Sequence, residues 1–390
     1  MKARIVIAVV LGTALGGCMV GPDYRRPDVV VPPEYKEAGA WKPAQPADNA
    51  ERGAWWKTFS DPQLDVLEAQ LEIGNQNLRL AEAQYRQARA LVGQARSALF
   101  PSLTGSVSVT RSRSPASAAP TPSHLISLDA SWEADLWGRV RRSVEANVAG
   151  AEASAADLAN ARLSAQAELA SDYFQLRVLD VQRQLFEDTV AAYRKSLVLT
   201  RNRYAVGVAG KVDVAQAQAQ LTSTQAQAID LGVARAQLEH AIAILLGKAP
   251  AQFSLPRASI AIGMRDIPPG LPSQLLERRP DIAAAERRVA AANAQIGVAK
   301  SAFFPDLTLS ASGGFQSSSV ANWISAPNRF WALGPALAQS IFDAGLRSAL
   351  SEQAIAAYDA SVASYRQTVL GAFQEVEDNL AALRILGDEA

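Results

Sequence analysis

Hydrophobic and polar residues alternate from Pro305 to Gln316, directly after a long stretch of strong helix formers. Residues 281–304 are rich in Ala, Glu, Arg and Gln and contain no Pro, which is typical of a helix. Pro305 ends that stretch, because proline cannot continue a helix. The alternation beyond it predicts a two-faced strand over 305–316. Its hydrophobic positions are Leu307, Leu309, Ala311 and Phe315, and its polar positions are Thr308, Ser310, Ser312 and Gln316.

The same pattern occurs about 200 residues earlier in the chain. A helical stretch ends at Pro101, and Leu103, Val107 and Val109 then alternate with Ser and Thr. Pro101 and Pro305 therefore mark equivalent helix–strand junctions. Each copy continues into a second strand, so strands are expected at about 102–111, 124–133, 305–316 and 328–338. The chain is interpreted as a tandem duplication of a helix–strand–strand–helix unit.

The segment between the strands of the two copies predicts unusually long helices. No Pro occurs from residue 140 to residue 249. A helix over 139–203 would be about 100 Å long, far more than a globular domain needs. Hydrophobic residues recur there at spacings of 4, 3, 4 and 3, the pattern of a supercoiled helix. The positions are Val144, Val148, Ala151, Ala155 and Leu158.

A short interruption at residues 204–213 predicts the tip of a helical hairpin. Gly207 and Gly210 flank Val208-Ala209 and permit a tight turn, and Asp213 is expected to cap the returning helix. That helix should reach about residue 246. Residues 247–272 are rich in Pro and are interpreted as a connector or a small side structure.

The N-terminus has the features of a secretory signal. Lys2 and Arg4 precede an apolar run over 5–15, which is too short to cross a membrane as a helix. Leu15-Gly16-Gly17-Cys18 resembles a bacterial lipobox, so Cys18 is predicted to carry the lipid anchor; the alternative is a plain signal peptide with an incidental cysteine. The residue after Cys18 is Met19 and not Asp, which by resemblance to sorted lipoproteins favours the outer over the inner membrane.

The expected organisation has five parts. They are a signal peptide (1–17), a lipidated extended arm (18–60), a first repeat (61–246), a connector (247–272) and a second repeat (273–390). Asp61-Pro62 looks like a capped helix start, and a break is expected near Gly74. The aromatic residues of the arm either pin it to the body or belong to a disordered tether; they are Trp41, Trp55, Trp56 and Phe59.

Alignment of the two copies places Ala390 near the level of Arg183. A second tip and its returning helix are therefore expected beyond residue 390. Either the chain is a fragment or shortened version of a longer protein, which we favour, or the second copy is naturally truncated.

The strands are expected to carry one Ser/Thr-rich face and one apolar face. Each has about 10 residues, the length that a tilted strand needs to cross a bilayer. A sheet in lipid must close on itself, and one chain has too few strands to do so. Two chains would supply about 8 strands and a filled interior, whereas three would supply about 12 strands and a lumen. The alternative is a soluble β-layer with attached coiled coils.

Composition excludes several kinds of site. Lys and Arg balance Asp and Glu at 38 each, so no broad basic surface for nucleic acid is expected. Two His and one Cys make a metal cluster improbable, and no phosphate-binding loop is present. Arg278-Arg279-Pro280-Asp281 is interpreted as a helix start capped by Asp281, with the arginines facing solvent or a neighbouring chain. We predict no enzymatic activity and no cofactor.

Three stretches resemble one family. They are GPDYRRPDVVVPPEY after Cys18, RYAVGVAGKVDVAQAQAQL at the hairpin tip, and LLERRPDIAAAERRVAAANAQIGVAKSAFFPDLTLSAS. They are similar to TolC-like outer membrane factors, in particular the lipoprotein (NodT-type) branch of multidrug (RND-type) efflux systems. The resemblance implies a homotrimer with a 12-stranded barrel in the outer membrane and an α-helical barrel in the periplasm.

The resemblance also implies partners. A periplasmic adaptor protein, joined to an inner-membrane transporter, would meet the tip, whose predicted contact residues are Tyr204, Val206, Gly207, Val208, Gly210 and Asp213. The expected function is passive export of drugs or other small molecules from the periplasm. Two alternatives are a conduit of a type I protein secretion system and, in a different class, a periplasmic coiled-coil scaffold lipoprotein.

Overall fold

The structure is a computed structural model that describes residues 19–29, 53–113, 119–259 and 279–389. The signal segment, Cys18, Trp41, Arg278 and most of the predicted connector lie outside the described residues. The chain forms two compact units. Of the described residues, unit 1 contains 19–29, 84–113, 119–157 and 279–389, and unit 2 contains 53–83 and 158–259. Unit 1 thus combines the strands of both sequence copies, so the two units are not the two repeats.

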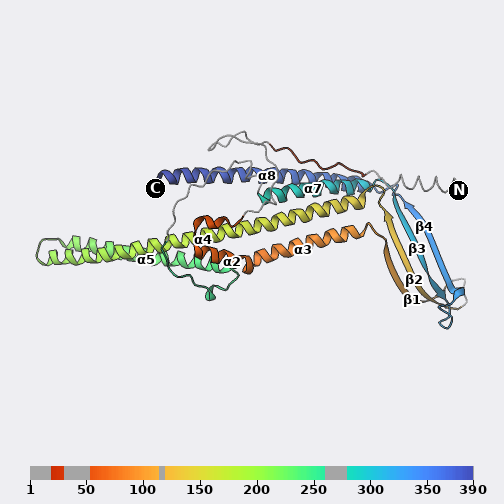
Figure 1. Cartoon of the computed structure of the whole chain (residues 1–390), viewed down its shortest axis with the longest axis horizontal. Helices are drawn as coiled ribbons and strands as arrows, with labels where there is room; N and C mark the ends of the chain where they lie inside the picture. Colours follow the sequence, from red (N-terminus) through yellow and green to blue (C-terminus); the bar gives the residue numbers. More distant parts are fainter. Residues whose placement is uncertain (1–18, 30–52, 114–118, 260–278, 390) are drawn as a thin grey trace. The chain divides into compact units, whose positions relative to one another are not determined.

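Unit 1 is organised around one antiparallel sheet with the strand order β1-β2-β3-β4 (Figure 1). Its strands are β1 (Ser102–Ser112), β2 (Thr121–Ala134), β3 (Asp306–Ser317) and β4 (Arg329–Ala338). Each lies within a few residues of the predicted range. The central pair, β2 and β3, joins the first copy to the second, so the two copies form a single sheet.

Long helices account for most of the remaining described residues. They are α2 (Pro62–Gly74), α3 (Gln76–Ser97), α4 (Arg139–Ala205), α5 (Lys211–Leu245), α7 (Pro280–Ser301) and α8 (Leu346–Glu389). Short 3-10 turns are η1 (Trp55–Phe59), η2 (Pro250–Gln252) and η3 (Ala326–Asn328). No helix in the described part of the chain combines the length and apolarity needed to cross a membrane.

The predicted break near Gly74 has a specific cause. Asn75 ends α2 and caps α3, because its Oδ1 accepts a hydrogen bond from the Leu78 amide at 3.0 Å. The side-chain amide of Asn75 donates to the Leu245 carbonyl. A Cβ on Gly74 would lie 2.1 Å from the Leu246 carbonyl oxygen, so the helix bends where the α5 end crosses it. Asp61 caps α2 as predicted, accepting from the amides of residues 63 and 64.

The prediction that Asp281 caps α7 is wrong. Arg279 occupies the N-cap position and Pro280 the first helical position, so Asp281 lies inside the first turn. Its carboxylate accepts from the Arg279 guanidinium at 2.8 Å, and the same guanidinium reaches Glu375 on α8 at 2.7 Å. Arg279 therefore links α7 to α8 instead of facing solvent. The proline displaced the cap by two residues, because it prefers the first helical position.

The 4-3-4-3 spacing in α4 is present, but on a different stripe from the predicted one. Val144, Val148 and Ala151 are only half-buried. The buried positions are Arg142, Ala146, Ala149, Ala153 and Ala156. Ala156 packs with Ala283 and Ala284 of α7, so the small side chains let the two helices approach closely. The larger valines lie beside this contact and not in it.

Each unit has its own hydrophobic core. In unit 2, leucines of α2 pack with Leu169, Tyr173 and Leu176 of α4 and with Ile242 of α5; Trp55, Trp56 and Phe59 cover this cluster. The predicted pinning role thus holds for the three described arm aromatics. In unit 1, α7 and α8 pack side by side through Val289, Val369 and Phe373 (Figure 1).

Candidate functional site

The register of the sheet sorts apolar and polar side chains onto opposite faces. Residues directly opposite each other in neighbouring strands point to the same face. Val107 pairs with Ile126, and Ile126 with Phe315; Ser106 pairs with Ser127. The apolar face, defined here, consists of Leu103, Val107, Val109, Ile126, Leu128, Ala130, Trp132, Leu307, Leu309, Ala311, Phe315, Trp331, Leu333, Pro335 and Leu337.

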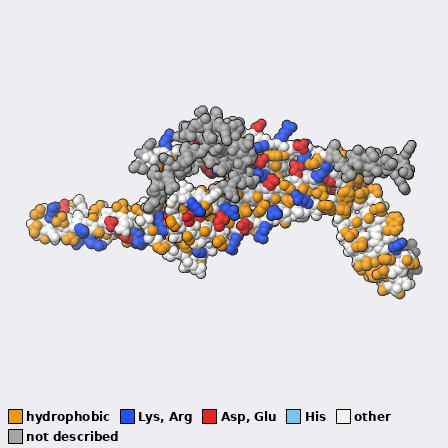
Figure 2. All heavy atoms as spheres, in the orientation of Figure 1, with side chains coloured by type: hydrophobic (Ala, Val, Ile, Leu, Met, Phe, Trp, Pro, Cys, Tyr) orange, Lys and Arg blue, Asp and Glu red, His pale blue; other side chains and the backbone are white. Residues whose placement is uncertain are grey.

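The apolar face is largely open to solvent. Leu103 is 70% exposed, Trp331 78% and Leu333 76%. Figure 2 shows the strand region covered mainly by hydrophobic atoms, with few charges on the visible side. Monomeric soluble proteins rarely expose contiguous apolar surface of this kind. The sheet therefore presents a surface suited to lipid.

The opposite, polar face carries Ser and Thr on three strands. Ser106, Ser127 and Asp129 form a chain of hydrogen bonds across β1 and β2, with oxygen–oxygen distances of 2.7 Å. The expectation of a Ser/Thr-rich face is wrong for β4. Its positions on this face are Phe330, Ala332, Gly334, Ala336 and Ala338. The alternation there is between large and small apolar residues, which a hydrophobic-versus-polar pattern does not separate.

Aromatic residues brace the predicted helix–strand junctions. The Trp137 indole N–H donates to the Pro305 carbonyl at 2.8 Å, and its ring stacks on Phe304 with centroids 4.7 Å apart. The Trp132 indole donates to the Leu99 carbonyl, two residues before Pro101. Pro101 directly precedes β1 and Pro305 directly precedes β3, and a hydrogen-bonded tryptophan lies near each of them.

The hairpin tip at residues 204–213 is a tight turn between α4 and α5. Gly207 has a φ of 78°, and the amides of Val208 and Ala209 both donate to the Arg203 carbonyl. Val206 and Val208 are about three-quarters exposed, at 74% and 75%, and Tyr204 is also exposed. The tip therefore presents apolar side chains on a backbone shape that requires glycine at one position.

Asp213 stabilises the tip in a different way from the predicted one. Gly210, in extended conformation, is the N-cap of α5, and Asp213 is the third helical residue. Its carboxylate accepts a hydrogen bond from the Gly210 amide at 2.7 Å. Asp213 therefore reaches back to the cap residue and does not occupy the cap itself.

Residues 19–29, called the strap here, lie in a seat built by α4, α7 and α8. The Val20 amide donates to the Trp137 carbonyl at 3.0 Å, and Met19 packs against Gly138. The Asn293 side-chain amide donates to the Pro22 carbonyl. Tyr24 donates to Glu286, and burial together with that hydrogen bond raises the pKa of the Tyr24 phenol.

Arg142 is the centre of this seat, and it is only 2% exposed. Its guanidinium donates to the carbonyls of Val20 and Gly21 and to the carboxylates of Asp23 and Glu145. Sequence reasoning missed Arg142, since it is one of many arginines at a helix start. The available signal was the GPDY stretch itself, whose Gly21 and Asp23 are among the partners of Arg142.

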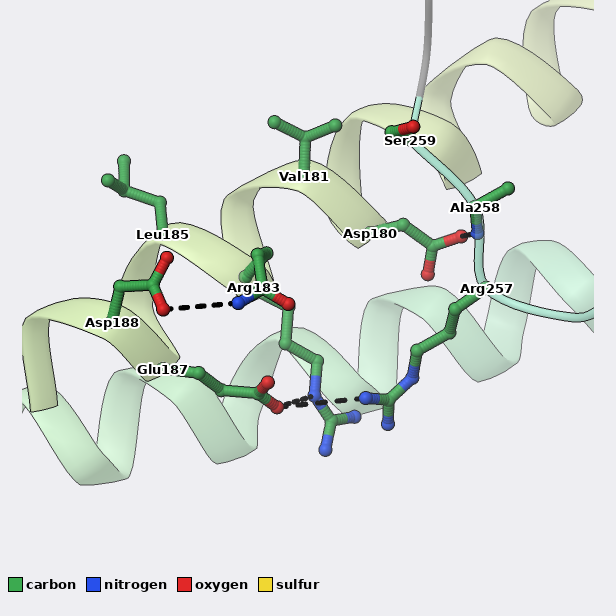
Figure 3. Close-up of a pocket in the computed structure, with 10 residues that line it drawn as sticks. Asp180, Val181, Arg183, Leu185, Glu187, Asp188, Arg257, Ala258 and Ser259 are labelled. Atoms are coloured by element: carbon green, nitrogen blue, oxygen red, sulfur yellow. Dashed lines mark hydrogen bonds and ion pairs between the residues drawn. The ribbon is translucent and has the colours of Figure 1, made fainter. Parts of the chain in front are cut away.

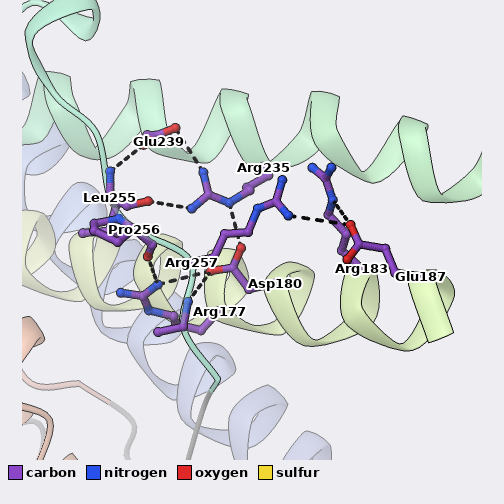
Figure 4. Close-up of polar contacts among 10 residues, drawn as sticks. Arg177, Asp180, Arg183, Glu187, Arg235, Glu239, Leu255, Pro256 and Arg257 are labelled. Atoms are coloured by element: carbon purple, nitrogen blue, oxygen red, sulfur yellow. Dashed lines mark hydrogen bonds and ion pairs between the residues drawn. The ribbon is translucent and has the colours of Figure 1, made fainter.

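A second polar cluster, called the clasp here, ties residues 255–258 to the α4–α5 hairpin (Figure 4). Asp180 accepts from Arg235 at 2.7 Å, from Arg177 at 3.2 Å and from the Ala258 amide at 3.3 Å. The two arginines also donate to the Pro256 and Leu255 carbonyls, each at 2.7 Å. The fourth member, Glu239, accepts from Arg235 and from the Leu255 amide.

A cavity of about 470 Å³ lies beside the clasp (Figure 3). Arg183 and Arg257 both reach Glu187 across it, at 3.0 and 3.6 Å, and Gln184 donates to Asp188. These side chains pair with one another and include no nucleophile beside a base. Among the residues that the structure describes, no group of three His, Cys, Asp or Glu could hold a metal ion. His124 lies near the start of β2, with its ring 5.5 Å from the Trp323 ring between centroids.

Comparison with known proteins agrees with this arrangement. Residues 66–248 and 271–390 match the outer membrane efflux protein family. The chain is 33% identical to the probable efflux pump outer membrane protein TtgC of Pseudomonas putida, over all of this chain and 82% of that protein. It is 30% identical to the cation efflux system protein CusC of Escherichia coli, over 96% of this chain and 82% of that protein.

Solved structures show the same fold. The outer-membrane channel OprN superposes with a TM-score of 0.87 at 34% identity, over 95% of this chain and 84% of that one. The open state of the Neisseria gonorrhoeae MtrE outer membrane channel gives 0.82 at 29% identity, over 95% and 83%. The chain therefore belongs to the outer membrane efflux protein family.

Proposed function

We propose that three copies of this chain close into a 12-stranded barrel in the outer membrane, through which drugs or other small molecules leave the periplasm. The observation that carries this proposal is the four-stranded sheet with one exposed apolar face and two unpaired edges, β1 and β4. In lipid, unpaired backbone groups cost several kcal/mol each, so such edges must find partners.

The strand directions allow identical copies to supply those partners. Neighbouring strands are antiparallel throughout, so β4 runs opposite to β1. The β4 edge of one copy can then pair antiparallel with the β1 edge of the next. Two copies would give a barrel of about 8 strands, whose interior side chains would fill. Three copies give about 12 strands and leave a water-filled lumen. The polar face lines that lumen.

The hairpin tip is the proposed contact with a periplasmic adaptor protein and, through it, with an inner-membrane transporter. The exposed Tyr204, Val206 and Val208 support this role, since apolar residues on a fixed turn suit a protein partner. Passage through the conduit is passive, and the protein contributes geometry and not chemistry. The parts 1–17, 18–60, 61–246, 247–272 and 273–390 are retained as the proposed organisation.

Cys18 is the proposed lipid attachment site. The strap begins one residue later, with Met19 against Gly138 and Val20 bonded to Trp137. Trp137 follows the end of β2 by three residues. The two residues that directly follow the proposed anchor are therefore held close to the helix–strand boundary, where the outer membrane meets the periplasm in the proposed arrangement.

Disulfide crosslinking between β1 and β4 of neighbouring copies tests the barrel. Ser106→Cys on β1 would be combined, one pair at a time, with Cys at positions 330, 332, 334, 336 and 338 on β4, since the polar face contains all of them. We expect oxidation of outer membranes to give covalent dimers and trimers for at least one pair. The matched control, Ser312→Cys with Ala332→Cys, joins directly opposed residues within one chain and should leave the mobility of a monomer.

An intramolecular control disulfide without any intermolecular product would contradict the barrel. Planar-bilayer recordings of the purified protein supply the functional test, in which we expect stable conductance steps. A periplasmic scaffold would give neither crosslinked trimers nor conductance.

A further inference from the structure

The charged residues of the four strands are sorted by sign between the two faces of the sheet. All four strands are described, and their charged residues are Arg111, Asp129, Glu133, Asp306 and Arg329. Arg329 pairs with Phe315 and Arg111 with Pro122, which places both arginines on the apolar-face register near the loop ends. The three carboxylates share the polar face. This face thus has negative charge and no positive charge of its own.

Two of the carboxylates lie beside a cation at the helix end of the sheet. Glu133 forms an ion pair with Arg139, the first residue of α4. Asp306 lies within electrostatic range of the same guanidinium. Their charge is therefore partly balanced where the strands meet the helices.

Asp129 differs from them in position and surroundings. It lies mid-strand, opposite Thr104 on β1 and Ser312 on β3, and its side chain is exposed. Among the described residues, no Lys or Arg forms an ion pair with it. Its hydrogen-bond partner is the Ser127 hydroxyl, at 2.7 Å, which is neutral and so cannot cancel the charge of a carboxylate.

We infer that Asp129 makes the β-barrel lumen selective for cations over anions. This inference rests on the proposed function, in which the polar face lines a lumen shared by three copies. Three Asp129 carboxylates would then stand at one level of the lumen. Like charges lining a passage with low-dielectric walls attract counter-ions and repel co-ions, so cationic solutes pass more readily than anionic ones of the same size.

Reversal potentials in planar bilayers under a KCl gradient test the inference on the complete chain. We expect the unsubstituted protein to pass K⁺ in preference to Cl⁻. Asp129→Asn should lower the permeability ratio several-fold, since it keeps the hydrogen bond from Ser127 and removes the charge. Asp129→Lys should invert the preference. Ser312→Lys, directly opposite on β3, should lower the ratio by an independent route. The preference should weaken at high salt, because screening shortens the reach of the charge.

Arg329→Gln is the matched control, because it removes one charge from the opposite face, and it should leave the ratio unchanged. Each purified variant would first be checked for the same trimer on unheated gels. Conductance with the same permeability ratio in the unsubstituted protein, Asp129→Asn and Asp129→Lys would overturn the inference and leave the conduit intact. An absence of conductance in the unsubstituted protein would overturn the conduit and the inference together.

Discussion

Gly21 of the strap and Gly297 of α7 meet backbone to backbone. A Cβ on Gly21 would lie 2.5 Å from the Gly297 Cα, a distance that no real side chain tolerates. Gly21 also has a φ of 100°, which favours glycine. The strap therefore crosses α7 at a point where neither segment has a side chain, and the Arg142 guanidinium holds the strap there through the Val20 and Gly21 carbonyls.

Replacing Gly297 with Val should release the strap. A Cβ at this position would lie 2.8 Å from the Arg142 Cγ and 2.9 Å from the Val20 carbonyl oxygen. We expect a loss of roughly 1–3 kcal/mol in the free energy of unfolding, as for other overpacked sites. Hydrogen–deuterium exchange should show faster exchange in residues 19–29.

Gly150→Ala is the control for that substitution. Gly150 lies in α4, and a Cβ there would meet nothing within 4 Å. Alanine should be neutral or stabilise by about 0.5–1 kcal/mol, because glycine is unfavourable inside a helix. Unchanged strap exchange in Gly297→Val would contradict the proposed crossing.

Glu68 should make the stability of unit 2 depend on pH. Its side chain is fully buried in α2, and neither carboxyl oxygen has a hydrogen-bond partner within the protein. Burial, and secondarily the charge of Glu72, raise the pKa of Glu68 from its usual 4.5 to about 8. Since the folded state holds the proton more tightly than the unfolded state, stability is full below pH 4.5 and falls as the pH rises to about 8.

Glu68→Gln removes that proton uptake while keeping the shape of the side chain. We expect its free energy of unfolding to exceed that of the unsubstituted protein at pH 8 by on the order of 1–3 kcal/mol, with the difference shrinking towards pH 5. Tryptophan fluorescence would follow unfolding, because Trp55 and Trp56 pack on the same core. The exposed Glu82→Gln on α3 is the control; equal pH profiles for all three proteins would exclude a role for Glu68.

Asp180→Asn should free residues 255–258 from the α4–α5 hairpin. The substitution leaves Arg177 and Arg235 charged and partly buried without their shared carboxylate. Breaking such a pair typically costs about 3–5 kcal/mol. Trypsin should then cleave after Arg257 much faster than in the unsubstituted protein. Asp188→Asn, on the other side of the cavity, should leave cleavage at Arg257 unchanged; equal rates in both variants would argue against the clasp.

The two tip glycines should differ in their sensitivity to substitution. Gly207→Val places a β-branched residue at a φ of 78°, at a cost of roughly 1–2 kcal/mol, and should reduce crosslinking to the adaptor. Gly210 has a φ of −82°, and a Cβ there would make ordinary contact with Asp213. Gly210→Val should therefore be tolerated better. Adaptor crosslinking that is equal for both variants and the unsubstituted protein would exclude the tip as the docking surface.

Cys18→Ser should abolish lipid attachment. We expect intact-mass analysis of the membrane-extracted protein to show diacylglycerol on the unsubstituted chain and none on the variant. Equal lipid mass in both would exclude Cys18 as the anchor. The strap should still occupy its seat in the variant, because the contacts of Met19 with Gly138 and of Val20 with Trp137 do not involve the substituted side chain.

The features that depend on local pattern could be predicted from the sequence, and those that depend on tertiary contacts could not. Alternation located the strands, and Pro101 and Pro305 located their junctions. The seat of the strap could not be predicted, because Arg142 meets Val20 and Gly21 across more than a hundred residues. The buried stripe of α4 could not be predicted because several neighbouring stripes share the same spacing. Packing against α7 places the alanine stripe in the contact, since small side chains allow the close approach.

The directions of the strands do not by themselves fix the number of subunits in the barrel. Because each copy contributes four strands in strict antiparallel alternation, a ring of two, three or four copies would close without a mismatched seam. Antiparallel pairing between copies is therefore compatible with each of these subunit numbers. The choice of three copies then depends on features outside the strand register, so we expect substitutions that change copy number to lie in the helices and to spare the membrane strands.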